Sequence, residues 1–316
     1  MTIPYIDAQQ INQSLSFPEL IAKLKAAFAS EITVPLRHHH DFDNPQEGLD
    51  SSLLLMPAWQ EGKELGVKIV TISPNNSKYN LPSIHGLYLL FDAHKGTPQA
   101  IIEGKALTNK RTAAASALAS SFLSKEDSQT LLMLGTGSLA PELVKAHASV
   151  RPISKVFVYG RSLAKAQAMA ESLKGVAAEV LPIEKYEKVL PEADIISTAT
   201  LSKTPLIHGI HLKEGQHIDL VGSYKPDMRE ADDQVMLRGT VYIDNWEGAM
   251  KETGDIAIPL STGILQKKGI QGDLFDLCRG KINGRKEAKA ITVFKSVGHA
   301  LEDLTAAQLL IQSLKQ

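Results

Sequence analysis

The chain has 316 residues, of which 43% are hydrophobic, so it is long enough for two domains with cores of their own. Its formal net charge of -1, with Lys and Arg spread along the sequence, excludes the basic surface that nucleic-acid binding requires. No apolar run approaches the roughly 20 residues that cross a bilayer, and no signal-peptide pattern opens the sequence, so we expect a soluble cytoplasmic protein without a membrane partner.

The first part of the chain predicts a helix and an antiparallel sheet. The helix covers residues 16–30, where Ser16 can cap the start and Glu19 completes a capping box. Residues 53–90 contain short β-rich runs separated by Pro, Asn and Gly, a pattern typical of antiparallel strands. The Ala-rich residues 107–124 predict another helix, which leads from this first domain into a second one.

From Gln129 onward, apolar strands alternate with amphipathic helices, and this alternation predicts an α/β domain with a parallel, doubly wound sheet. A strand-like run at residues 290–296 and a helix at residues 298–314 are expected to return the chain to the first domain. The predicted first domain is therefore discontinuous, with residues 1–122 and 291–316, and the nucleotide-binding domain comprises residues 123–290.

A glycine pattern follows the first strand of the second domain. Gly135, Gly137 and Ala140 form a G-x-G-x-x-A arrangement at the start of a helix. In a dinucleotide site the first Gly permits a tight turn, the second lets the pyrophosphate approach the backbone, and the third small residue lets helix and strand pack closely. The alternative is an ordinary strand-to-helix turn. The candidate cofactor contacts are Gly135, Thr136, Gly137, Ser138 and Leu139.

The end of the next strand indicates which dinucleotide fits. NAD sites usually carry Asp or Glu there to bind the ribose 2′-hydroxyl, whereas an Arg accommodates a 2′-phosphate. Here Gly160 replaces the acid, and Arg161 and Ser162 follow. This favours NADPH, with NADH as a weaker alternative, because Arg161 can form a charge-assisted contact to the phosphate. The alternatives are a helix N-cap for Ser162 and a solvated surface charge for Arg161.

Three cationic residues of the first domain are candidates for binding an anion: Arg37, Lys68 and Arg111. Lys68 stands in the middle of an apolar strand, and lysine is seldom buried without a partner. A bound carboxylate would supply that partner. The alternatives are the solvent face of an edge strand for Lys68 and an exposed helix position for Arg111.

The sequence lacks the residue patterns that metal sites and hydrolase active sites require. His38 to His40 are adjacent in a predicted strand, so their side chains alternate between faces, and no acid or Cys stands at ligand spacing nearby. The single Cys278 excludes an intrachain disulfide and is expected to be a small buried residue. Because G-x-S-x-G, P-loop and H-E-x-x-H patterns are all missing from the sequence, we expect neither a hydrolase nor a kinase.

The sequence resembles the ornithine cyclodeaminase and mu-crystallin family over essentially its whole length. The resemblance rests on stretches in the family's order, among them GVKIV, LGTGSLA, VYGRS, ADIISTAT, VGSYKPDMRE, TGDIAIPL and FKSVGHALEDLTAA. It implies a Rossmann domain inserted in an α/β domain that dimerises through its sheet, with an active site in the interdomain cleft. A homodimer is thus expected from the resemblance.

The resemblance also implies roles for particular residues. It assigns the binding of the substrate carboxylate to Arg37, Lys68 and Arg111, of which Lys68 and Arg111 are the expected catalytic residues. It assigns cofactor contacts to Thr112, Thr198, Ala199, Thr200, Gly222, Ser223 and Ser296. It assigns substrate contacts to His85, Tyr224, Val297 and Gly298.

Tyr224 distinguishes branches of this family. Ornithine cyclodeaminases carry an Asp there in a G-G-D setting, where a carboxylate can orient the substrate amine and the water that expels ammonia, but here the stretch is G-S-Y. A phenol is a poor base at neutral pH. The motif resembles the branch that reduces cyclic ketimines, Δ1-pyrroline-2-carboxylate and Δ1-piperideine-2-carboxylate. The alternative for Tyr224 is a packing residue that closes the pocket.

The expected reaction is therefore NADPH-dependent reduction of a cyclic imino acid to L-proline or L-pipecolate. Hydride adds to C2 of the protonated imine while the cationic residues hold the carboxylate, and Lys68 is the candidate for tuning the imine proton. Three alternatives stay open: an ornithine cyclodeaminase, an alanine dehydrogenase of the same fold, and a non-catalytic mu-crystallin-like protein that binds NADPH and a small ligand.

Overall fold

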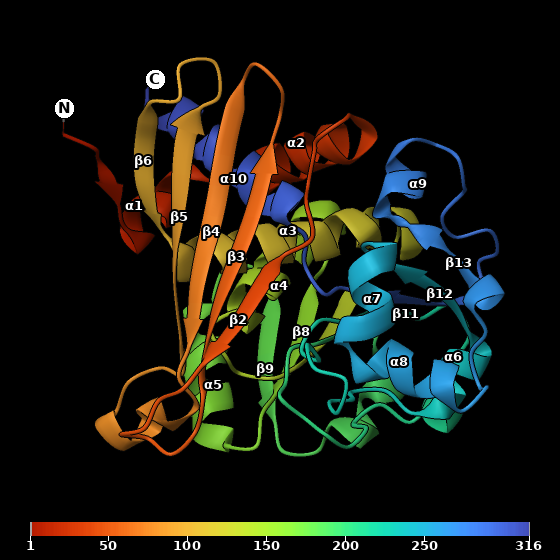
Figure 1. Cartoon of the computed structure of the whole chain (residues 1–316). Helices are drawn as coiled ribbons and strands as arrows, with labels where there is room; N and C mark the ends of the chain where they lie inside the picture. Colours follow the sequence, from red (N-terminus) through yellow and green to blue (C-terminus); the bar gives the residue numbers. More distant parts are fainter. Residues whose placement is uncertain (1, 316) are drawn as a thin grey trace. The chain divides into compact units, whose positions relative to one another are not determined.

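The computed structural model describes residues 2–315, which form two compact units (Figure 1). The residues up to Arg111 and those from Ala300 onward form the discontinuous unit, and Thr112–His299 form the inserted unit. Helix α3 (Gly104–Leu123) carries the chain from one unit into the other.

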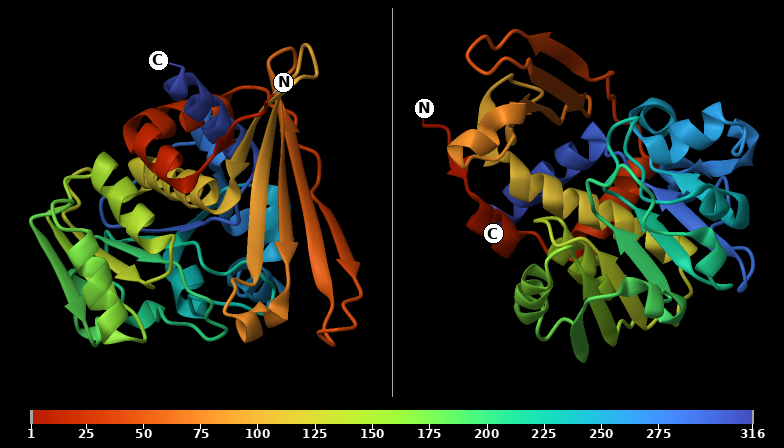
Figure 2. Two further views of the ribbon diagram at one scale, coloured as in Figure 1. Left: turned by 90° about the vertical axis from the view of Figure 1, so that its left-hand side faces the viewer. Right: turned by 90° about the horizontal axis from the view of Figure 1, so that it is seen from below.

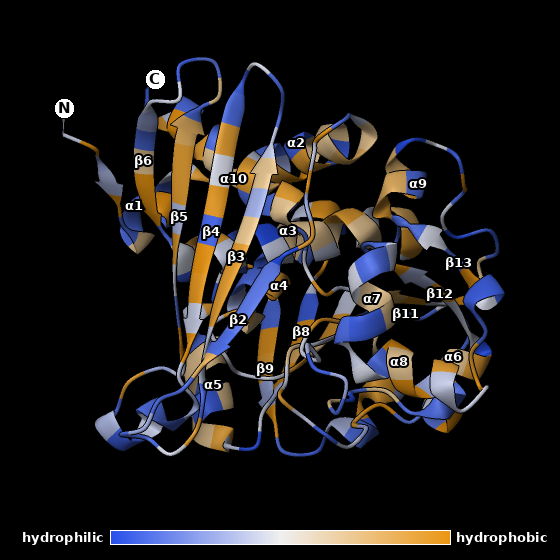
Figure 3. Ribbon diagram, viewed as in Figure 1, coloured by the Kyte–Doolittle hydropathy of each residue, from blue (hydrophilic) through white to orange (hydrophobic). Residues whose placement is uncertain are grey.

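The discontinuous unit is built on a six-stranded sheet in the order β1-β6-β5-β4-β3-β2. Strands β2 to β6 pair antiparallel with their neighbours, as the turn-rich sequence predicts, and β1 pairs parallel with β6. In Figure 3 the central strands β4 and β5 are mostly hydrophobic, whereas the edge strand β2 is hydrophilic. The strands are β1 (Tyr5–Ile6), β2 (His38–Phe42), β3 (Ser51–Trp59), β4 (Glu64–Ile72), β5 (Ile84–Asp92) and β6 (Pro98–Glu103).

Three helices cover one face of this sheet: α1 (Ala8–Ser14), α2 (Phe17–Ala29) and α10 (Ala300–Leu314), seen in the left view of Figure 2. Helix α10 packs on β3, β4 and β5 and against α2. The predicted capping box of α2 is not formed, because the Ser16 hydroxyl donates to the Glu19 carboxylate at 2.8 Å and caps no backbone N–H. A capping box is found instead at α1, between Asp7 and Gln10.

The inserted unit contains an eight-stranded parallel sheet in the order β13-β12-β14-β11-β10-β7-β8-β9. From β7 the order runs outward in both directions, which is the doubly wound arrangement that the sequence predicts, with its switch point between β7 and β10. The strands are β7 (Thr130–Leu134), β8 (Lys155–Tyr159), β9 (Glu179–Ile183), β10 (Ile195–Thr198), β11 (His217–Leu220), β12 (Gly239–Ile243), β13 (Ile270–Asp273) and β14 (Ile291–Lys295).

The central strands of this sheet are buried on both faces and carry Ile196, Ile218 and Val293 into the core, although β11 also buries the polar residues His217 and Asp219. The helices that accompany them are α4 (Ala140–Val150), α5 (Leu163–Ser172), α6 (Asp233–Arg238), α7 (Trp246–Glu252), α8 (Gly254–Ser261) and α9 (Leu274–Cys278). A search of residues 2–315 finds no helix long and apolar enough to cross a membrane.

The structure corrects the predicted domain boundary. The prediction that the chain returns to the first domain at residue 291 is wrong, because β14 is hydrogen-bonded between β11 and β12 of the parallel sheet. The return comes at Ala300, and the first boundary lies at Arg111 within α3, earlier than the predicted residue 122. An apolar strand alone does not indicate which of two sheets it joins.

Candidate functional site

The glycine turn between β7 and α4 has the backbone geometry of an anion-binding turn. Gly135 has a φ of +121°, and a Cβ there would lie 2.5 Å from the Ala199 carbonyl oxygen, so only glycine fits. A Cβ at Gly137 would meet no atom of the described chain within 4 Å, which leaves the turn open on that side. At the start of α4 the Ala140 N–H donates to the Gly137 carbonyl at 3.1 Å and Pro141 has no N–H, so an anion here would bind to the backbone of the turn itself.

The end of β8 lies against this turn. A Cβ at Gly160 would lie 2.7 Å from the Thr136 Cγ2 atom, so glycine permits the close approach. Ser162 caps α5, since its hydroxyl oxygen accepts from the Lys165 N–H at 3.4 Å, and Arg161 is exposed. The strand end thus carries a cation and no carboxylate where a dinucleotide presents its adenosine ribose.

The predicted cofactor loops follow neighbouring strands. Thr198 ends β10, Gly222 and Ser223 follow β11, and Ser296 follows β14. Strands β14, β11, β10 and β7 are consecutive in the sheet, so their carboxyl ends share one edge. Ligands of doubly wound sheets bind outside this edge. Thr112 lies in α3 and is buried.

Asp244, which follows β12, fixes the loop after β14. Its Oδ2 accepts from the Val297 and Gly298 N–H groups, each at 2.6 Å. Burial raises the pKa of Asp244, and these backbone N–H groups oppose the rise. Asp244 is absent from the predicted site residues, because its partners are more than 50 positions away in the sequence.

In the discontinuous unit, Lys68 and Arg111 meet at one carboxylate. The Lys68 Nζ donates to the Asp303 Oδ2 at 2.7 Å, and the Arg111 Nε donates to the Asp303 Oδ1 at 3.0 Å. The Arg111 Nη1 also donates to the Glu302 Oε2 at 2.7 Å. Lys68 and Arg111 are 4% and 5% exposed, so the four side chains form a buried charge cluster.

The cluster shifts the proton affinities of its members. Burial, with the nearby charge of Arg111, lowers the pKa of Lys68 to about 8, although Asp303 opposes this shift. Burial also disfavours charge on Arg111 and Asp303, but their mutual attraction and the neighbouring charges outweigh it: the pKa of Arg111 is raised and that of Asp303 is lowered. Lys68 is thus the member whose proton is most easily exchanged near neutral pH.

Both alternatives for these cations are wrong. Lys68 lies on β4, a central strand between β3 and β5, and Arg111 is buried. Their protein partners Asp303 and Glu302 satisfy the burial, so a bound carboxylate is not needed to explain it. Sequence reasoning missed both acids, although the stretch FKSVGHALEDLTAA that contains them contributed to the family resemblance.

The sheet register adds Tyr88 to this cluster. Met56 pairs with Lys68, and Lys68 pairs with Tyr88, so the three side chains share one sheet face. Arg37 immediately precedes β2, whose register begins at the pair of His38 and Leu55, so its contact with the cluster stays a prediction. The Tyr88 hydroxyl is buried with no hydrogen-bond partner in the described part of the chain, and burial raises its pKa.

His85 lies on the other face of the sheet. It pairs with Thr71, and residues an odd number of positions from Lys68 along β4 point away from the Lys68 face. It lines a pocket of about 510 Å³ with Ile69, Thr71 and Leu87. The structure does not bring His85 together with Lys68 and Arg111, so a contact to the same substrate stays a prediction that the register does not support.

Tyr224 lies in the loop after β11 and is 41% exposed. The Lys225 ammonium lies 5.7 Å from the centre of its ring. The preceding Ser223 is buried, and its hydroxyl donates to the Met228 carbonyl at 2.7 Å. The loop is thus anchored at Ser223, while Tyr224 projects from it.

Comparison with known proteins bears on what this arrangement does. Residues 5–316 match the ornithine cyclodeaminase/mu-crystallin family. The chain belongs to this family. The match covers both units, so the family resemblance expected from the sequence motifs is confirmed.

Relatives within the family include named reductases. The chain is 37% identical to the Δ1-pyrroline-2-carboxylate reductase of Colwellia psychrerythraea, with 98% of each chain covered. It is 40% identical to the protein SAR DEFICIENT 4 of Arabidopsis thaliana, covering 97% of this chain and 96% of that one. Among solved structures, the Δ1-pyrroline-2-carboxylate reductase of Thermococcus litoralis in complex with NADH and L-proline superposes with a TM-score of 0.90. It is 31% identical, with 98% of this chain and 97% of that chain covered.

In residues 2–315, no group of three His, Cys, Asp or Glu side chains could hold a metal ion. His39 bonds to Asp41 at 3.0 Å on the exposed edge strand β2.

Proposed function

We propose that the protein is a nicotinamide-dependent oxidoreductase that reduces the C=N bond of a cyclic 2-imino acid. The observation that carries this proposal is the arrangement of Lys68 and Arg111, which Asp303 holds side by side. Asp303 and Glu302 already balance their burial, and a substrate carboxylate would be a further partner of both cations. Membership of the family and the relatives named Δ1-pyrroline-2-carboxylate reductase support the same conclusion.

Substrate binding falls to the discontinuous unit. A carboxylate on C2 of the imine accepts hydrogen bonds from Lys68 and Arg111, and Arg37, which immediately precedes β2 in the same unit, adds a third positive charge. Asp303 and Glu302 hold the two buried cations in fixed positions before substrate arrives, so little ordering is needed on binding.

Cofactor binding falls to the inserted unit. The glycine turn after β7 receives the pyrophosphate, and the nicotinamide supplies the hydride when it is bound. We propose a preference for NADPH, because Arg161 is exposed at the end of β8 and the residues there offer no carboxylate to a ribose 2′-hydroxyl.

The reaction balances with a protonated imine. The hydride forms the new C–H bond at C2, and the π electrons of the C=N bond become the lone pair of the ring nitrogen. A five-membered ring yields L-proline and a six-membered ring yields L-pipecolate. Lys68, with a pKa of about 8, is an ammonium at neutral pH and is the group that we assign to keep the imine protonated.

We also propose a homodimer formed through the six-stranded sheet. The face opposite the helices is apolar and only half-buried, as expected of a surface that a second copy covers. Scattering that gives the mass of one chain for the active protein would refute this. The residues on that face include Leu53, Leu55, Val67, Ile69, Leu87, Leu89 and Ile101.

The test of the function is cofactor oxidation by the purified protein. We expect rapid oxidation of NADPH, and slower oxidation of NADH, with Δ1-pyrroline-2-carboxylate or Δ1-piperideine-2-carboxylate. Pyruvate with ammonia should be a poor substrate pair, and ornithine should release no ammonia. Turnover with pyruvate and ammonia but not with an imine would indicate an alanine dehydrogenase, and ammonia release from ornithine alone would indicate a cyclodeaminase. Binding of NADPH without any turnover would indicate a storage role.

A further inference from the structure

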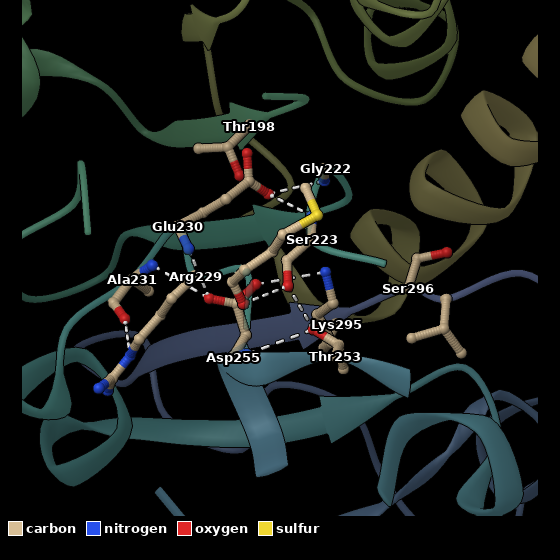
Figure 4. A network of polar contacts seen from close by, with 12 residues as sticks. Thr198, Gly222, Ser223, Arg229, Glu230, Ala231, Thr253, Asp255, Lys295 and Ser296 are labelled. Atoms are coloured by element: carbon tan, nitrogen blue, oxygen red, sulfur yellow. Dashed lines mark hydrogen bonds and ion pairs between the residues drawn. The ribbon is translucent and has the colours of Figure 1, made fainter. Parts of the chain in front are cut away.

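Three charged side chains of the inserted unit lie completely buried in one network, which Figure 4 shows. Glu230 follows β11, Asp255 lies in the first turn of α8, and Lys295 is the last residue of β14; each is 0% exposed. Burial of charge is costly unless every group is paired and hydrogen-bonded. Their convergence at the carboxyl edge of the sheet therefore calls for a reason.

Glu230 joins the loops that follow two adjacent strands. Its Oε1 accepts from the N–H and the hydroxyl of Thr200, at 2.8 and 2.7 Å, just after β10. Its Oε2 accepts from the Gly222 N–H at 2.6 Å and the Ser223 N–H at 3.3 Å, just after β11. One carboxylate thus fixes the distance between these two loops.

Asp255 and Lys295 extend the network to a third strand. The Asp255 Oδ1 accepts from the N–H groups of Glu230 and Ala231, at 2.8 and 3.1 Å. The Asp255 Oδ2 lies 3.3 Å from the Lys295 Nζ. Because Lys295 ends β14, the chain of contacts spans the carboxyl ends of β10, β11 and β14, which are neighbours in the sheet.

The backbone is shaped to the carboxylate. A Cβ at Gly222 would overlap the backbone of Thr200 and lie 2.5 Å from the Glu230 Oε1, so a side chain there would displace the loop or the carboxylate. Thr253 adds a further tie, since its hydroxyl lies 2.8 Å from that of Ser223. The two loops are therefore held in one arrangement from several directions.

The charges of the network are unequal, because two carboxylates share one ammonium. Burial raises the pKa of Glu230, Asp255 adds to that rise, and Lys295 opposes it. The hydrogen bonds from Thr200 favour the ionised carboxylate, which can accept from all of its donors at once. Each Glu230 side-chain oxygen thus acts as the acceptor for one of the two loops.

We propose that Glu230, supported by Asp255 and Lys295, is a positioning residue for the nicotinamide end of the cofactor. This inference rests on the proposed function. The glycine turn after β7 is assigned to the pyrophosphate, and in a doubly wound sheet the second half of a dinucleotide lies across the switch point, toward the strands that start with β10. Glu230 acts through the loops at Thr200 and Gly222, which it holds in place.

The test compares Glu230→Gln with wild type. A Gln side chain keeps the shape, but its amide nitrogen is a donor and must face either Thr200 or Gly222, so one of the two ties is lost. We expect the Kd for NADPH, from fluorescence titration, and its KM to rise about tenfold. The KM for Δ1-pyrroline-2-carboxylate should stay within about twofold, because the discontinuous unit binds that substrate.

The matched control is Gln216→Met. Gln216 is buried at the amino edge of the same sheet, where its amide donates to the Leu190 and Ala193 carbonyls at 2.8 and 2.7 Å. It also ties loops together, yet at the edge away from the proposed cofactor. Its loss should lower the Tm by an amount similar to Glu230→Gln and leave the Kd and KM for NADPH unchanged.

The outcomes separate the two hypotheses. An unchanged KM for NADPH in Glu230→Gln, or equal increases in Glu230→Gln and Gln216→Met, would overturn the positioning role while leaving the reductase intact. A wild-type protein that neither binds NADPH nor reduces the imine would remove the proposed function and, with it, this inference. If Glu230→Gln does not fold, Thr200→Val deletes one donor to Glu230 and should raise the KM about threefold; no change would again overturn the role.

Discussion

In the discontinuous unit, Lys68 and Arg111 bond to the side-chain carboxylates of Asp303 and Glu302, whereas in the inserted unit Glu230 and Asp255 bond mainly to backbone N–H groups. The carboxylates of the first cluster hold cationic side chains in place. The second holds loops in place through their backbone. We infer from this difference that buried charge can prepare a site either by presenting charges to a ligand or by shaping the chain around one.

The comparison is tested most strongly by Lys68→Met. If the first cluster presents its charges to the substrate, kcat/KM for the imino acid should fall at least about a hundredfold, because a charged hydrogen bond and the proposed proton control are lost together. Asp303 keeps Arg111 as a partner, so the variant should fold. Lys63→Met, at an exposed lysine just before β4, is the control, and equal activities of the two variants would contradict the proposed role.

A buried histidine of the inserted unit should affect stability and not activity. Burial lowers the pKa of His217 to about 3, although the charge of Asp219 opposes the shift, and the unfolded chain has an ordinary value of about 6.5. Between these values the unfolded state binds more protons, so the free energy of unfolding falls as the pH falls below about 6.5. The loss at about pH 5 should be roughly 2 kcal/mol.

Urea unfolding of wild type and His217→Leu at about pH 7.5 and about pH 5 measures this contribution. The variant loses the contact of the His217 Nδ1 with the Thr292 hydroxyl at 3.0 Å, so it starts less stable. Its further loss on acidification should be smaller than that of wild type by roughly 2 kcal/mol. Parallel pH dependence in both proteins would show that His217 is not the group responsible.

Asp303→Asn sharpens the comparison by changing the charge of the first cluster without removing its cations. The negative charge of Asp303 raises the pKa of Lys68, so its loss should move that pKa further below about 8. Since the proposal requires the ammonium form, kcat/KM should decline with rising pH, and the decline should begin at lower pH in the variant. At about pH 8 the variant should be about tenfold less active. Asp303→Glu keeps the charge, and an identical pH profile for Asp303→Asn and wild type would contradict the coupling.

The smallest expected effect concerns cofactor choice. Arg161→Ala should raise the KM for NADPH about fivefold and leave that for NADH within about twofold, because only NADPH carries the 2′-phosphate. Lys174→Ala, at an exposed lysine just beyond α5, should change neither value. Equal increases for both cofactors would mean that Arg161 does not read the phosphate.

The sequence predicted those features of the site that depend on residues close together in the chain. The G-x-G-x-x-A stretch identified the turn at Gly135, because a positive φ and close packing leave few residue types. The sequence also indicated that Lys68 needs a partner. It did not identify Asp303, which lies 235 positions further along the chain. The same distance problem hid the contacts of Glu230 with Asp255 and of Asp255 with Lys295.

The sequence also did not predict the register of the strands, which decides the residues that pair across neighbouring strands. Whether His85 shares a face with Lys68 depends on how β4 and β5 pair, and the structure pairs His85 with Thr71 on the opposite face. Likewise β14 is an apolar strand that could extend either sheet, and only its hydrogen bonds to β11 and β12 assign it to the inserted unit.

The position of Asp303 on α10 also bears on how the protein is made. Lys68 and Arg111 leave the ribosome long before their acidic partners, and the whole inserted unit is synthesised in between. The nascent chain therefore carries these two cations without the carboxylates that pair with them in the folded protein. The buried charge cluster cannot form until α10 has been synthesised. During synthesis, the inserted unit can complete its fold first.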